Sequence, residues 1–327
     1  MRAQLSRLAE RWRGGAYYSS VCSWTSAPKG CAAGGWGAGR KCGSRSVRAT
    51  IHRTMSEDHF PVHDEFIYCS GGATEVLKFG PWKDLQKSNG ESKPKLLILI
   101  IPEYDQMEDV FGLNGQIEHK LSFMKEHVPA DIKLILIGHS IGCYIILEMM
   151  KRAADLKVLQ SIMLFPTIER MAQSPQGKIM TPLLCSLRYV FYMPLYLLSF
   201  LPENLKTSLV RFVLRGIKSV DEASVEACLN LFRMDCAANA MYMGSQEMVK
   251  VLERDNNTIK RNLQKLIFYY GATDNWCPVQ YYEEMKKAFP EGSILLCEKG
   301  IRHAFVLDSS NEVATMTIDW LKKRSLC

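Results

Sequence analysis

Runs of consecutive apolar residues recur along the chain, and most of them end at or near a glycine or a proline. Each run has the length and composition of a strand that is buried on both faces. Several of the stretches between the runs carry apolar residues at helical spacing. Strands that alternate with helices predict a mostly parallel sheet with helices on both faces. The runs are residues 96–101, 132–137, 158–165, 266–271 and 293–297.

Two more strands are expected ahead of the first run. Residues 65–69 and 74–79 are rich in strand-forming side chains, and the small and polar sequence SGGA, residues 70–73, separates them. This pattern predicts an antiparallel hairpin at the start of the folded part of the chain.

Two helices have boundary signals in the sequence. Asn114 is a candidate N-cap followed by apolar residues at helical spacing, and His119 and His127 are expected at the surface of this helix. Ser309 and Glu312 have the spacing of a capping box, which predicts the start of the last helix.

The segment 167–262 interrupts the alternation and is mostly helical in character, so it predicts a cap inserted between two strands of the sheet. Within it, residues 179–201 carry a single charge, Arg188, and contain Pro182 and Pro194. Three interpretations stay open: an interfacial or hairpin insertion into lipid, a helical cap packed against the sheet, and a membrane-spanning helix. The two prolines disfavour the last, and the aromatic residues of the segment are of the kind found at membrane interfaces.

The net charge of +7 belongs to the start of the chain. Residues 1–54 hold ten Lys or Arg against one acid, Glu10, which leaves the remainder with a net charge of −2. A near-neutral remainder argues against a nucleic-acid-binding face. The basic leader is expected to be disordered, and a mitochondrial transit peptide is the alternative. The start of the chain lacks the continuous apolar core of a secretory signal, so passage into the secretory lumen is not expected. Translation from Met1 and from Met55 both fit this pattern.

The eleven cysteines and seven histidines show no CxxC pair and no HExxH motif, so neither a metal nor a cofactor is expected. Several of the cysteines lie within apolar runs. They are expected to be small buried side chains in a reducing compartment. These are Cys69, Cys143, Cys185 and Cys297.

The sequence Gly138-His139-Ser140-Ile141-Gly142 follows the run at residues 132–137, and a helical pattern begins after it. In a nucleophile elbow, a serine lies at such a strand-to-helix turn, and the flanking Gly138 and Gly142 let the strand and the helix approach closely. Ser140 is then the candidate nucleophile, and the backbone N–H of Ile141 is one candidate oxyanion-hole donor. The alternative is a tight turn with an inert serine.

Asp274 and His303 each follow a later predicted strand, in the order Ser, Asp, His that is typical of α/β hydrolases. The carboxyl ends of parallel strands meet at one edge of a sheet, so the three loops can converge. Taken alone, Asp274 is a turn residue and His303 a loop residue. Their order favours a catalytic triad in which His303 is the base and Asp274 orients it.

Five motifs occur in order along the chain: residues 95–102, 112–121, 138–142, 164–170 and 268–271. Together they resemble the lipid droplet-associated hydrolase family, over about residues 55–325. The resemblance implies an α/β-hydrolase fold and a serine hydrolase of lipid esters, with cholesteryl ester among the proposed substrates. It also implies residence on lipid droplets and the endoplasmic reticulum, with residues 179–201 helping to anchor the protein to the lipid surface.

The sequence departs from the family at two places. The leader, residues 1–54, has no counterpart there. After Pro102 the family has a Gly-Asn-Pro-Gly turn that resembles an oxyanion loop, then a helix, a strand and the entry to a further helix, whereas here Pro102 leads directly into the acidic stretch 103–109. One βα unit is therefore missing, as in an exon-skipped isoform. We expect the sheet to re-pair or stay open beside the nucleophile strand, and we expect the second oxyanion donor to be absent.

Two functions are open at this point. The first is a droplet-bound serine esterase that acts on a lipid ester, with the acyl chain under the segment 179–201. The second is a non-catalytic protein of the lipid surface that lacks a competent oxyanion hole, and a mitochondrial hydrolase is a third. The oligomeric state is left open. The expected organisation is a leader (1–54), a first part of the hydrolase core (55–166), the cap (167–262) and a second part of the core (263–327).

Overall fold

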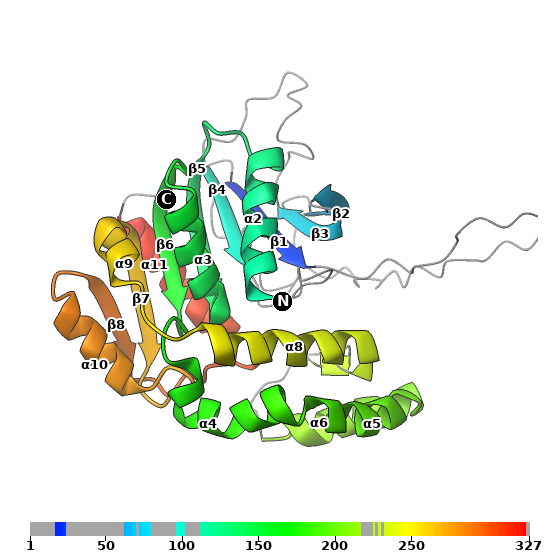
Figure 1. Ribbon diagram of the computed structural model, residues 1–327. Helices are drawn as coiled ribbons and strands as arrows, with labels where there is room; N and C mark the ends of the chain where they lie inside the picture. Colours follow the sequence, from blue (N-terminus) through cyan, green and yellow to red (C-terminus); the bar gives the residue numbers. More distant parts are fainter. Residues whose placement is uncertain are drawn as a thin grey trace, which may run out of the picture.

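The computed structural model describes residues 17–23, 62–69, 72–79, 96–101, 112–216, 225, 228–229 and 232–324. Eight strands in these ranges form one sheet with the order β2-β3-β1-β4-β5-β6-β7-β8 (Figure 1). They are β1 (Tyr17–Ser23), β2 (Val62–Cys69), β3 (Gly72–Phe79), β4 (Leu96–Ile101), β5 (Lys133–His139), β6 (Val158–Leu164), β7 (Leu266–Gly271) and β8 (Ser293–Cys297).

Every predicted strand is present in this sheet. β2 and β3 pair antiparallel over their full length, which confirms the hairpin. From β1 to β8 all neighbouring strands are parallel. The prediction of a mostly parallel sheet is therefore confirmed.

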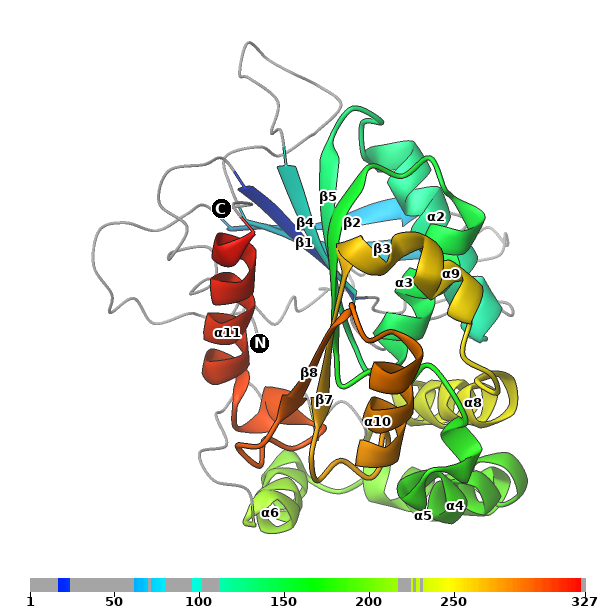
Figure 2. The ribbon, with the colours of Figure 1, turned by 90° about the vertical axis from the view of Figure 1, so that its left-hand side faces the viewer.

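Helices cover both faces of the sheet, as expected. Figure 2 shows α2, α3, α9 and α10 on one face and α11 on the other. The apolar side of each helix packs against the strands, because parallel strands are apolar on both faces. The bounds are α2 (Leu113–His127), α3 (Ile141–Arg152), α9 (Asn256–Asn262), α10 (Val279–Ala288) and α11 (Ser310–Lys323), with the short turns η4 (Leu263–Lys265) and η5 (Phe305–Leu307).

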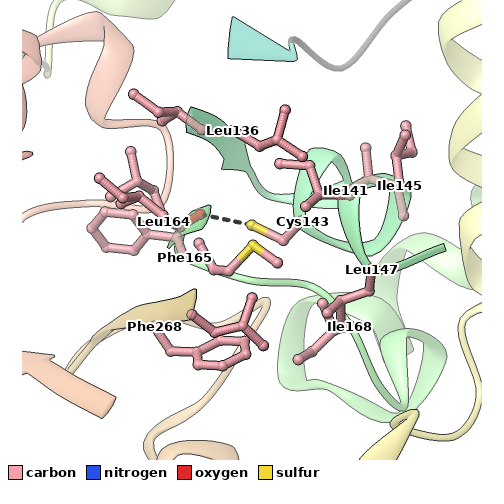
Figure 3. Close-up of a cluster of buried hydrophobic side chains, with 14 of the residues drawn as sticks. Leu136, Ile141, Cys143, Ile145, Leu147, Leu164, Phe165, Ile168 and Phe268 are labelled. Carbon is pink, nitrogen blue, oxygen red and sulfur yellow. Dashed lines mark hydrogen bonds between the residues drawn. The ribbon is translucent and has the colours of Figure 1, made fainter. Parts of the chain in front are cut away.

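The core lies where α3 crosses the central strands. Leu136, Ile141 and Phe268 come from β5, α3 and β7 and pack into one cluster of fully buried side chains (Figure 3). Cys143 belongs to the same cluster and its Sγ lies 3.6 Å from the carbonyl oxygen of Leu164. This packing fixes the start of α3 against the ends of β5 and β6.

β1 lies within the basic leader, so the expectation of disorder is wrong for residues 17–23. This strand is parallel to β4 and antiparallel to β3, and it occupies the position between them. β4 also pairs directly with β5, from Leu96–Lys133 to Ile101–Gly138. Of the two expected outcomes, re-pairing or an open sheet, the structure therefore shows re-pairing beside the nucleophile strand. The other residues of the leader lie outside the described residues.

The predicted helical insertion follows β6 and lies beyond the carboxyl ends of the central strands (Figure 1). Residues 179–201 do not form one helix, because α4, η2 and α5 divide them. No residue of α5 is buried, and its main contacts are with α8 and η2. The interpretation as a packed cap therefore fails for α5, but it holds for the start of the segment, where Leu184 is buried in the main core. The elements are η1 (Met171–Gln173), α4 (Pro175–Thr181), η2 (Pro182–Ser186), α5 (Arg188–Ser199), α6 (Glu203–Leu214) and α8 (Met234–Lys250).

Among the residues that the structure describes, none of the helices combines the length and apolar character that crossing a membrane requires.

Three local predictions at the helices need correction. The N-cap of α2 is Gly112, not Asn114. His119 is buried rather than at the surface, and burial together with the neighbouring Lys120 lowers its pKa to about 4. Ser309 is the N-cap of α11, but its hydroxyl donates to Asp308 instead of closing a capping box.

The cysteine predictions are mostly met. Cys143 and Cys297 are free and buried, and Cys185 is free and partly buried. The side chain of Cys69 lies outside the described residues.

Candidate active site

Ser140 lies at the corner between β5 and α3, in a backbone conformation with φ 55° and ψ −124°. A non-glycine residue with positive φ is strained, and such strain occurs at functional turns. The corner is tight, because a Cβ on Gly138 would lie 2.8 Å from the backbone carbon of Gly142. Glycine is therefore required at position 138 to bring the strand and the helix this close.

The hydroxyl of Ser140 begins a chain of two hydrogen bonds. Its Oγ lies 2.9 Å from Nε2 of His303, and Nδ1 of His303 lies 2.6 Å from Oδ2 of Asp274. Because the carboxylate only accepts, Nδ1 donates to Asp274 and leaves Nε2 free to accept the Ser140 proton. The three candidate residues, from loops after β5, β7 and β8, are thus brought together at the carboxyl edge of the sheet.

Asp274 is buried and receives hydrogen bonds on both oxygens. Oδ1 accepts the backbone N–H groups of Trp276 and Cys277, at 2.7 and 3.3 Å. Oδ2 accepts His303 and also the thiol of Cys277, whose Sγ lies 3.0 Å away. Burial acts to raise the pKa of Asp274, but the hydrogen bonds from His303, Cys277 and Trp276 outweigh it and hold the pKa below its usual range. The carboxylate therefore stays ionised at neutral pH.

Ile141 is the first residue of α3, so its N–H is among the amides that a helix leaves without an internal partner. It directly follows Ser140, as an oxyanion donor must. The second donor expected in an α/β hydrolase comes from the loop after the strand beside the nucleophile strand. That strand is β4, and its last residue, Ile101, pairs with Gly138. The loop that follows, residues 102–111, lies outside the described residues.

Two residues of the site were not predicted from the sequence as members of it. His139 places its Nε2 2.8 Å from the backbone carbonyl oxygen of His303. Phe165 has a positive φ of 49° and turns its ring toward His303, with the ring centroids 6.1 Å apart. The signal for His139 was present, since it lies inside the elbow motif. No local pattern distinguishes Phe165 from an ordinary residue at the end of a strand.

Asp274, Cys277 and His303 also form a group whose potential metal-ligating atoms lie within 4.8 Å of one another. A metal would need the thiolate of Cys277. Burial and the neighbouring Asp274 carboxylate raise the pKa of this thiol well above its ordinary value, so it remains protonated and donates to Asp274. The hydrogen bonds that Asp274 accepts from His303 and Cys277 account for the closeness of these three side chains.

The family to which the chain belongs follows from comparison with known proteins. Residues 86–306 match the family described as lipid-droplet associated hydrolase. The chain is a member of this family. The lipid droplet-associated hydrolase of Gallus gallus is 56% identical over 317 residues, covering 83% of this chain and 98% of the relative. The protein of the same description from Homo sapiens is 44% identical over 317 residues, covering 81% and 97%.

The solved structures support the fold. A candidate lipase of Acinetobacter baumannii superposes with a TM-score of 0.54 and 13% identity, covering 80% of this chain and 91% of that chain. At this identity the similarity concerns the fold alone, and it confirms an α/β-hydrolase fold.

The alignment with the Gallus gallus relative also shows a difference in length. The alignment spans 317 positions, but it includes only 83% of the 327 residues of this chain. This share is fewer than 317 residues, so some aligned positions hold a residue of the relative and none of this chain. The relative therefore carries residues that this chain lacks. This agrees with the βα unit that the sequence predicts to be missing after Pro102.

The lowered pKa of Asp274 has a consequence for stability. A carboxyl group with a lowered pKa in the folded state stabilises the fold above its unfolded pKa of about 3.9, and this contribution is lost as the pH falls through the folded pKa. We expect Asp274→Asn to have a lower Tm than the unaltered chain at pH 7, with the difference narrowing below about pH 4. Thermal unfolding between pH 7 and pH 3 measures it.

Asp319→Asn is a matched control, because Asp319 is exposed on α11. It should follow the unaltered chain at every pH. A Tm difference for Asp274→Asn that stays constant down to pH 3 would contradict the assignment of the stabilisation to the Asp274 carboxylate.

Proposed function

We propose that this chain is a serine hydrolase of lipid esters that acts at the surface of lipid droplets, with the endoplasmic reticulum membrane as a second location. Ser140 is the nucleophile, His303 the general base and then the acid, and Asp274 the carboxylate that orients His303. The hydrogen-bond chain from Ser140 through His303 to Asp274 is the observation that carries the proposal. Labelling of Ser140 by a fluorophosphonate tests it.

The geometry supports a two-step reaction. Ser140 Oγ attacks the ester carbonyl carbon while its proton passes to Nε2 of His303. The N–H of Ile141 donates to the developing oxyanion. When the tetrahedral intermediate collapses, His303 protonates the leaving alcohol, and the acyl group stays on Ser140. Water then attacks the acyl group with His303 again as base, and the fatty acid leaves.

The substrate class rests on the family and on the surface of the insertion. The relatives are described as lipid droplet-associated hydrolases, which favours an ester with a fatty acyl chain, and cholesteryl ester is one such substrate. Reaction in an apolar phase also fits the position of the insertion, which lies beyond the carboxyl ends of the central strands (Figure 1), and Ser140 directly follows the last residue of β5.

An apolar surface on α5 is the candidate contact with the droplet. Val190, Met193 and Leu197 are exposed by 66%, 64% and 61%, and their spacing of three and four residues places them on one side of the helix. α5 contacts α8, which lies between α5 and the sheet in Figure 1. An exposed apolar surface of this kind is typical of a site that binds a membrane or another protein. α6 adds the exposed Phe212 and Val213.

Replacing Val190, Met193 and Leu197 together by glutamine is expected to weaken binding to phospholipid-coated triacylglycerol droplets by at least about 10²-fold, because each buried side chain contributes about 1–2 kcal/mol. Hydrolysis of a water-soluble ester should be unchanged. Flotation of the protein with the droplets measures the binding.

The double variant Val249→Gln and Leu252→Gln is the matched control, because both residues are apolar and more than half exposed but lie outside α5. Val249 lies near the end of α8 and Leu252 lies just beyond it. This double variant should bind droplets as the unaltered chain does. Equal binding by the α5 variant would refute the role of α5.

A second candidate function is that of a non-catalytic protein of the droplet surface. It is favoured by the residues that the Gallus gallus relative has and this chain lacks. The residues that the relatives have and this chain lacks include, by the sequence prediction, the turn that supplies the second oxyanion donor. Such a protein would keep the α5 surface and the triad residues but would not react with a fluorophosphonate.

A further inference from the structure

His139 makes a direct bond between the two halves of the site. It is the last residue of β5, next to Ser140, and its Nε2 lies 2.8 Å from the backbone carbonyl oxygen of His303. The two residues are 164 positions apart in the sequence. This bond is separate from the two bonds that the side chain of His303 makes.

The chemistry of the bond sets the form of the His139 ring. A carbonyl oxygen only accepts, so Nε2 of His139 carries the hydrogen. Burial, with a further contribution from His303, lowers the pKa of His139 to about 3, and the ring is neutral at physiological pH. A neutral donor at this place adds no positive charge beside His303 when His303 takes up a proton.

The loop that carries His303 needs such support. β8 is the last strand in the order of the sheet, whereas β5, which carries the elbow, is central. Residues 298–304, between β8 and η5, contain no regular helix or strand, and Gly300 has a φ of 71°. His303 is therefore held on an edge loop, while its partner Ser140 is held in the core.

Aromatic rings complete the support on the same side. The ring of His139 meets that of Phe305 edge to face with centroids 4.8 Å apart, and Phe305 stacks on Phe165 at 5.5 Å. Phe305 begins η5, two residues after His303. The ring centroid of His139 also lies 5.3 Å from that of His303, so the ring of His139 meets the loop on both sides of the peptide group that it binds.

We propose that His139 is a positioning residue, which donates its Nε2–H to the His303 carbonyl and so holds the imidazole of His303 within hydrogen-bond distance of Ser140. This inference rests on the proposed roles of Ser140 and His303. The displacement that it prevents is costly, since an error of about 1 Å in the placement of a reacting group reduces the rate by about 10²-fold.

Three substitutions test the bond. The amide nitrogen of glutamine reaches about as far as Nε2 of histidine, that of asparagine is one bond shorter, and phenylalanine keeps the ring without a donor. We expect His139→Asn and His139→Phe to lower kcat on p-nitrophenyl butyrate by about 10- to 100-fold with little change in KM, and to slow fluorophosphonate labelling equally. His139→Gln should retain most of the activity of the unaltered chain.

The comparison of His139→Gln with His139→Asn does not depend on the ring, because both lose it. The rate per labelled Ser140 separates positioning from folding, since a purely structural role would change the labelled fraction and the Tm but not the rate of the folded molecules. Equal rates for the glutamine and asparagine variants, or an unchanged rate for His139→Phe, would overturn the inference. Failure of the unaltered chain to label would instead overturn the proposed function.

Discussion

Ser140→Ala is expected to abolish labelling by a fluorophosphonate and to lower kcat on a soluble ester by about 10⁶-fold, the size of loss that follows removal of a triad nucleophile. The loss is large because His303 and Asp274 act only through the hydroxyl to which His303 is bonded. Mass spectrometry of the labelled protein should place the adduct on the peptide that contains Ser140.

Ser208→Ala is a suitable control for this variant. Ser208 lies exposed on α6, and its hydroxyl only donates to the carbonyl of Asn204. Its replacement should leave labelling unchanged. If the unaltered chain is not labelled under conditions that label a relative carrying the additional stretch, the enzyme proposal is wrong for this chain and the non-catalytic alternative holds.

The labelling rate carries further information. Absence of one oxyanion donor reduces the rate by about 10²- to 10³-fold. We therefore expect this chain to react more slowly than such a relative by about that factor, with the adduct still on Ser140. The elbow and the triad geometry are complete among the described residues, so any such deficit should lie in stabilisation of the oxyanion.

Deletion of residues 1–54 is expected to destabilise the fold severely, because it removes β1 from the interior of the sheet. β1 pairs with β3 on one side and with β4 on the other. Without it, both neighbouring strands expose unpaired backbone groups and form two new sheet edges, which favour aggregation. The measurement is the Tm and the monomer fraction of the truncated chain against the full chain.

A single substitution tests the same strand without shortening the chain. Ser20→Pro places a proline in an interior strand, where it removes a ladder donor and leaves a buried acceptor unpaired, at a cost of about 1–3 kcal/mol. Ser20→Ala, which keeps the backbone N–H at the same position, is the control and should change the Tm much less. A truncated chain as stable and monomeric as the full chain would show that β1 is not needed.

The expected loss of stability on deletion of residues 1–54 has a consequence for the leader. If β1 completes the sheet, a product that begins at Met55, or one from which a transit peptide has been cleaved after Ser23, lacks a strand that the full chain has. The leader then supplies a strand to the part of the sheet beside β4. Its strand supplies the parallel neighbour of β4 from a different place in the sequence.

Much of the sheet and the order of the candidate catalytic residues were accessible from the sequence. The apolar runs at residues 96–101 and 132–137 are buried on both faces, so local composition alone identifies them as parallel strands. The elbow could be predicted for a similar reason, because a Cβ at position 138 would clash with the backbone of Gly142 and only glycine avoids this clash. Strand burial and the tight turn both depend on the residue types at those positions, so both can be recognised in the local sequence.

Tertiary structure decided the remaining features, because their causes lie far apart in the chain. The place of residues 17–23 in the sheet depends on which strand edges are free, and their own composition gives no sign of it. The burial of His119 depends on what packs on α2, and the role of His139 depends on a carbonyl 164 positions away. Contacts between distant residues are set by the free energy of the whole packed fold, and so the local sequence pattern does not contain them.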